Sequence, residues 1–92
     1  MGRCRYEKLK DLEPALEEIR EFENLKEPKP GIFYLRSQGF LHFHEKDDRI
    51  WADVRDGKSW GVPVDIPKKI TKPFLKDFVR EVSRRYETVT GK

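Results

Sequence analysis

The sequence predicts an α+β fold, a two-layer sandwich in which two helices cover one face of a four-stranded antiparallel meander. Three observations support this fold class. Apolar residues recur at helical spacing near both ends of the chain, apolar and polar residues alternate through its middle, and turn-forming residues separate the alternating stretches. No internal repeat interrupts the order α-β-β-β-β-α, so we expect a single domain that spans residues 1–92.

The first helix is expected over about residues 12–24, with a preceding turn around residues 6–9. Asp11 is placed to cap this helix, and Pro14 fits its first turn because that position needs no backbone donor. Two prolines in the segment 26–31 prevent further helix, so a short linker is expected there. The apolar side of the helix consists of Leu12, Ala15, Leu16, Ile19 and Phe22.

The second helix is expected over about residues 72–87. Thr71 is the predicted N-cap because its hydroxyl can accept a hydrogen bond from the first turn, where Pro73 is tolerated. The apolar stripe that is expected to pack on the sheet consists of Phe74, Leu75, Phe78, Val79, Val82 and Tyr86.

Four stretches rich in aromatic and β-branched residues are predicted strands. They cover about residues 31–36, 40–45, 49–55 and 59–65. The predicted connections are a three-residue loop at Ser37–Gly39, a two-residue turn at Asp47-Asp48 and a turn at Asp56-Gly57. Short loops of this kind join neighbouring antiparallel strands, so the strands are expected to form a meander.

The predicted register assigns the strand residues to two faces. Leu41 lies opposite Leu35 and Phe43 lies opposite Ala52, and this apolar set is expected under the helices. The other face is then open, and it is expected to carry Tyr34, Arg36, Phe40, His42, His44, Trp51, Asp53 and Arg55.

The face presented by the fourth strand depends on the length of the loop at Asp56. A two-residue loop and a three-residue loop send Trp60, Val62 and Val64 to different faces. We expect these three residues to face the helices.

Length and composition limit the class of protein. A chain of 92 residues with a net charge of +3 forms a thin core, in which aromatic residues supply much of the buried area. No apolar run approaches the ~20 residues of a membrane span, so no membrane association is expected. A single cysteine cannot form an internal disulfide, which favours a cytoplasmic protein stabilised by packing.

Metal binding is one predicted use of the open face. His42 and His44 alternate along one strand, so their side chains project from the same side with origins ~6–7 Å apart. Asp53 lies across from His42, and two imidazoles with one carboxylate leave open positions on a divalent metal. The sequence thus predicts a metal-binding protein or a metal-dependent enzyme that uses His42, His44 and Asp53. The alternative is that His42 and His44 are polar strand residues that hydrogen-bond to Asp53, Tyr34 or water.

Signatures of other catalytic chemistry are missing from the sequence. The chain has no Gly-rich phosphate loop, no Ser-centred elbow and no C-x-x-C pair. This favours binding over catalysis and indicates no cofactor other than a divalent metal.

Nucleic-acid binding is a second predicted use. Tyr34, Phe40 and Trp51 could stack on bases while Arg36 and Arg55 contact phosphates. Acidic residues on the same strands and the absence of a known RNA-binding signature count against this use. It therefore ranks below protein association.

Protein association is the use that the sequence favours first. Large aromatic groups exposed together usually mark an interaction site. Apposing two open sheet faces would bury Tyr34, Phe40 and Trp51 in a symmetric homodimer. We therefore expect a small binding or self-associating module centred on His42, His44 and Trp51.

A resemblance to small conserved bacterial proteins of unassigned function is carried by three segments. They are Gly31-Ile32-Phe33-Tyr34, Phe40-Leu41-His42-Phe43-His44-Glu45 and Ala52-Asp53-Val54-Arg55, which together give an FLHFHE...ADVR pattern. The resemblance covers roughly residues 31–85. It implies a prokaryotic, single-domain protein and supplies no activity that could be assigned to these residues.

Overall fold

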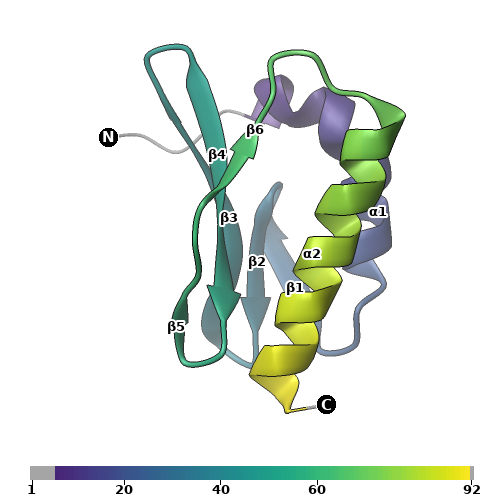
Figure 1. Ribbon diagram of the computed structural model, residues 1–92. Coiled ribbons are helices and arrows are strands. Elements are labelled where there is room, and N and C mark those ends of the chain that lie inside the picture. Colours follow the sequence, from purple (N-terminus) through teal and green to yellow (C-terminus); the bar gives the residue numbers. More distant parts are fainter. Residues whose placement is uncertain (1–5, 92) are drawn as a thin grey trace.

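An antiparallel sheet with two helices on one of its sides makes up the fold, which is the α+β sandwich expected from the sequence (Figure 1). The computed structural model describes residues 6–91. A 3-10 helix at Tyr6–Leu12 leads into α1 (Glu13–Arg20), and α2 (Lys72–Thr90) closes the chain. Between the helices lie β1 (Leu25–Lys29), β2 (Ile32–Leu35), β3 (Gln38–Lys46), β4 (Arg49–Asp56), β5 (Ser59–Trp60) and β6 (Val64–Ile66).

The sheet has six strands in place of the four expected. Its order is β1-β2-β3-β4-β5, and β6 pairs with β4 beside β5. Strand β1 falls in the segment that was expected to be a linker because of its prolines. Pro28 is tolerated there because β1 is an edge strand, where a missing donor costs no ladder bond. The expected strand over residues 59–65 is divided between β5 and β6.

The turn between β2 and β3 differs from the expected three-residue loop. It is a two-residue turn at Arg36 and Ser37, whose φ values are 53° and 72°, and Leu35 pairs with Gln38 across it. Positive φ at both central residues matches the right-handed twist of a hairpin. The prediction of a loop over Ser37–Gly39 was therefore wrong, and so was the expected pairing of Leu41 with Leu35.

A β-bulge in β3 moves Phe40 from the outer face to the core. Phe33 pairs with Leu41 while Tyr34 pairs with Gly39, so Phe40 is the extra residue between the two pairs. Phe40 and Leu41 are consecutive and are both fully buried. The Phe40 ring meets the Tyr86 ring of α2 edge-on, with centroids 6.1 Å apart. The expectation of an exposed Phe40 was wrong because it assumed uninterrupted alternation.

The hairpin of β3 and β4 has the predicted register. Leu41 pairs with Val54 and Phe43 pairs with Ala52, and these four side chains are buried under the helices. The turn is the predicted pair Asp47-Asp48, in which Asp47 has a φ of 57°. The alternating apolar residues of both strands are sufficient to specify this pairing.

The helices begin differently from one another. Leu12 occupies the N-cap of α1 without a side-chain hydrogen bond, so the expected cap at Asp11 was wrong, and α1 ends at Arg20. At α2 the Oγ1 of Thr71 accepts a hydrogen bond of 3.2 Å from the Phe74 backbone N–H, as predicted.

None of the helices within residues 6–91 is long and apolar enough to cross a membrane.

The core lies between the sheet and both helices. Each layer contributes fully or nearly fully buried apolar side chains, and each large one that leaves water contributes about 1.5–3 kcal/mol. The buried set is Leu9, Leu12, Ala15, Leu16, Ile19, Phe33, Leu35, Phe40, Leu41, Phe43, Ala52, Val54, Phe78, Val82 and Tyr86.

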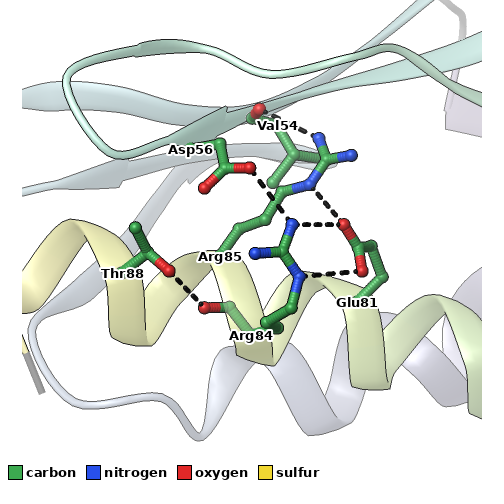
Figure 2. A network of polar contacts seen from close by, with 6 residues as sticks. All are labelled: Val54, Asp56, Glu81, Arg84, Arg85 and Thr88. Carbon is green, nitrogen blue, oxygen red and sulfur yellow. Dashed lines mark hydrogen bonds and ion pairs between the residues drawn. The ribbon is translucent and has the colours of Figure 1, made fainter.

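Arg85 of α2 reaches Val54 of β4 (Figure 2). Val54 lies between the part of β4 that pairs with β6 and the part that pairs with β5. Its side chain is only 7% exposed, and its Nη1 donates to the Val54 carbonyl at 3.2 Å. The same carbonyl accepts a hydrogen bond of 2.9 Å from the Gly61 backbone N–H. The Nε of Arg85 donates to Glu81 at 2.7 Å. This buried cation is therefore paired and hydrogen-bonded, as a buried charge requires.

Arg84 extends this polar network to the end of β4. Its Nη2 donates to Glu81 at 2.8 Å and to Asp56 at 3.1 Å (Figure 2). The hydrogen bond from Arg84 is the main cause that lowers the pKa of Glu81 from 4.5 to about 2, and the bond from Arg85 adds to it. Glu81 is thus hydrogen-bonded to two arginines, of which Arg85 also contacts Val54 and Arg84 also contacts Asp56, both in β4.

We predict that Gly61→Ala destabilises the protein by about 1–3 kcal/mol in urea unfolding, because a Cβ overpacks this position. The new atom would lie 2.8 Å from Arg85 Nη1, 2.9 Å from Asp56 Cβ and 3.1 Å from the Val54 carbonyl oxygen. Gly39→Ala is the matched control. Its Cβ would meet the Trp60 ring at an ordinary 3.5 Å, so a change within about 1 kcal/mol is expected. Equal losses in both variants would contradict this account.

We predict that Glu81 makes stability depend on acid pH. Because its pKa is lowered to about 2, its carboxylate contributes stability above pH 4.5, and the contribution is lost as the pH falls toward 2. The side chain is 35% exposed, so solvent screening limits this contribution to about 1 kcal/mol.

Urea unfolding between pH 7 and pH 2 tests this prediction. Glu81→Gln is expected to be less stable than the unmodified chain at pH 7 and to approach it at low pH. Glu87→Gln removes the same charge from the same helix outside the network of Figure 2, and is expected to run parallel to the unmodified chain. A constant difference between Glu81→Gln and the unmodified chain at every pH is the contrary result.

Candidate metal centre on the outer sheet face

The face of the sheet turned away from the helices, called the outer face below, carries both histidines of the chain. Leu41 and Phe43 point into the core, so the intervening His42 and the following His44 lie on the outer face. Asp53 of β4 pairs directly with His42 across the ladder. The register that buries the core residues therefore also sets the relative positions of these three polar groups.

His42, His44 and Asp53 converge as expected. One ligand atom from each lies within 4.8 Å of the others. His44 Nε2 is 2.9 Å from Asp53 Oδ2, and the two imidazole centroids are 4.6 Å apart with their planes nearly perpendicular. All three side chains are partly buried, which strengthens their mutual electrostatic interaction relative to bulk water.

Two tryptophans extend the imidazoles into a continuous row, called the ring row below, in the order Trp51, His44, His42 and Trp60. Trp51 stacks on His44 with centroids 5.5 Å apart, and Trp60 meets His42 edge-on at 4.6 Å. An arginine lies over each tryptophan, Arg49 at 5.6 Å from Trp51 and Arg55 at 4.5 Å from Trp60. Packing on both sides limits the rotation of the imidazoles.

The ring row includes a residue that was expected elsewhere. Arg55 pairs with Trp60 across a short turn, so Trp60 shares the outer face with Arg55 and the expectation that it faces the helices was wrong. Val62 is exposed, which is also contrary to expectation. Val64 pairs with Ala52 and packs against the core, as expected. The sequence did not specify the length of the loop after Asp56, and the faces of Trp60, Val62 and Val64 depend on that length.

The other expected members of the outer face have separate positions. Tyr34 is 40% exposed on β2. Arg36 lies in the turn after β2 and is exposed. Arg55 donates from Nε to the Gly39 carbonyl at 2.7 Å, which holds its guanidinium over β3. Phe40 is absent from this face because of the bulge.

The convergent set has the chemistry of a metal site. Imidazole nitrogen and carboxylate oxygen bind zinc-like ions at ~2.0–2.2 Å, so ligand atoms of one ion are ~3.3 Å apart. The ligand atoms now lie within 4.8 Å of one another, so binding of one ion would require side-chain rotations that shorten these distances. The pair of His44 and Asp53 is also satisfied without an ion, through their 2.9 Å contact. With an ion bound, His42 would be a ligand beside His44 and Asp53. Without an ion, the contact of His44 with Asp53 does not involve His42.

No family model, curated protein or solved structure matches this chain. The resemblance expected from the segments around His42 and Asp53 stays a prediction.

Proposed function

We propose that the protein is a small binding module whose working surface is the outer face, and that the centre of this face binds a divalent metal ion. The convergence of His42, His44 and Asp53 within 4.8 Å is the observation that supports the proposal. The three ligands come from two strands whose register is fixed by buried neighbours. Such a set needs little reorganisation to receive an ion.

The donor set favours one class of ion. Two imidazoles and one carboxylate suit zinc, cobalt, nickel and ferrous ions better than magnesium or calcium, which prefer all-oxygen ligands. Three protein ligands leave at least one position for water or an exchangeable ligand. The role proposed here is metal binding with an open position, and it assigns no reaction.

The neighbouring charges do not prevent cation binding. Arg49, the cation over Trp51, is paired with Asp65 at 3.0 Å. Arg55 directs its donors to the carbonyls of Gly39 and Lys58. Asp53 supplies a negative charge at the point where the two imidazoles meet.

Self-association through the outer face, which the sequence favours first, stays a prediction. The exposed rings of Tyr34 and Trp60 support it, and the burial of Phe40 removes one ring from the expected interface. A two-fold pairing also brings equivalent cations of both copies into one interface, which costs free energy. A cytoplasmic location and a bacterial source likewise stay predictions from the sequence.

We predict that protein purified without a histidine tag binds one zinc or cobalt ion per chain in calorimetric titration. Asp53→Asn and His42→Ala are each expected to weaken binding at least about tenfold, because each removes a ligand. His42→Ala is informative because it spares the contact between His44 and Asp53. The absorption spectrum of bound cobalt should report nitrogen and oxygen ligands, and zinc should raise the Tm.

Asp65→Asn is the matched control for the metal titration. Asp65 lies on the outer face opposite Trp51 and carries the same charge as Asp53, but it pairs with Arg49. This variant is expected to keep the affinity within about twofold, since it loses no metal ligand. No stoichiometric binding, or equal weakening in Asp65→Asn and Asp53→Asn, would refute the proposed metal site.

A further inference from the structure

Two shallow hollows adjoin Tyr34 on the outer face, and their lining does not include the proposed metal ligands. The larger hollow measures about 510 Å³ and the smaller about 360 Å³. Tyr34 and Pro28 line both of them. The other lining residues are Asn24, Lys26, Glu27, Arg36 and Ser37 in the larger hollow and Lys29 and Ile32 in the smaller.

The hollows are positively charged. Lys26, Lys29 and Arg36 are exposed at their rims. Glu27 is the acidic residue in their lining, but its carboxylate already accepts hydrogen bonds from the Arg20 guanidinium and, at 2.8 Å, from the Gly31 backbone N–H. The cations around Tyr34 are therefore exposed, and the carboxylate in the lining is engaged by other partners.

A second exposed ring adjoins Tyr34 across the sheet. Tyr34 pairs with Gly39, and the Trp60 ring covers Gly39 at 3.5 Å from the position of a Cβ. Tyr34 is 40% exposed and Trp60 is 41% exposed. Arg55 lies over the Trp60 ring. Cations and exposed aromatic rings thus lie together across the strands from Lys26 to Trp60.

We propose that this surface binds single-stranded nucleic acid. A base would stack on the exposed ring of Tyr34 within the hollows, while Lys26, Lys29 and Arg36 would contact the flanking phosphates. The next base along the strand would reach the exposed part of Trp60. Every base has a flat π-face, so the binding would depend little on sequence.

Charge distinguishes this occupant from a second copy of the chain. In a two-fold dimer over the same residues, Lys26, Lys29 and Arg36 would meet the same cations of the other copy. A polyanion meets them with opposite charge and releases counterions as it binds. The proposal does not depend on the metal site, because Asp53 and both histidines lie outside the lining of the hollows.

Fluorescence anisotropy of a labelled oligothymidylate at low salt tests the proposal. Tyr34→Ala is expected to weaken binding by about fivefold or more through loss of stacking, and Tyr34→Phe, which keeps the ring, should remain within about twofold. Lys26→Gln and Arg36→Gln should each weaken binding and reduce the slope of affinity against salt by ~0.7. Lys76→Gln, which removes one exposed cation from α2, is the charge-matched control and should change little.

Several outcomes would overturn the proposal. These are the absence of saturable binding, an equal loss in Lys76→Gln, or equal binding of Tyr34→Ala and the unmodified chain. Competition by a polyglutamate peptide as effective as that by unlabelled oligonucleotide would assign the hollows to acidic peptides. A dimer mass in light scattering that Tyr34→Ala returns to the monomer would assign the surface to a second copy. Asp53→Asn should not weaken oligonucleotide binding. Failure of the nucleic-acid proposal would therefore not count against the proposed metal site.

Discussion

The β-bulge at Phe40 is the constraint on which the two faces of the sheet depend. With the two-residue turn at Arg36 and Ser37 and no bulge, Phe40 would lie opposite Phe33 and Leu41 opposite Ile32. All later residues of β3 would then exchange faces, which would put the histidines under the helices and Phe43 in solvent. The extra residue restores the alternation, so one local irregularity decides that the imidazoles are accessible.

The same bulge explains why the sequence predicted the histidine face correctly from a wrong turn. A three-residue loop at Ser37–Gly39 shifts the alternation by one residue, and so does a two-residue turn followed by a bulge. Both arrangements direct Leu41 and Phe43 into the core, but only the two-residue turn with the bulge also buries Phe40. The pattern of apolar residues constrains which side chains need burial, and it does not say where the extra residue is accommodated.

Other differences from the sequence prediction have separate physical causes. Strand β1 was not predicted because it contains a proline, which an edge strand tolerates. The position of Trp60 depended on the length of one loop, a feature that periodicity does not report. The contact of Arg85 with the Val54 carbonyl joins residues 31 positions apart, so no local pattern could indicate it. By contrast, the hairpin that contains His42, His44 and Asp53 was predicted correctly from alternation and a short turn, because both are patterns of neighbouring residues.

The position of the tryptophans has a consequence for spectroscopy. The chain has two tryptophans, Trp51 and Trp60, and both lie at the ends of the ring row, outside the buried core. Each touches an imidazole and an arginine, groups whose charge and position can alter indole emission. Intrinsic fluorescence excited at the indole band is therefore a reporter of the outer face. The outer face of this protein can therefore be followed without any added label.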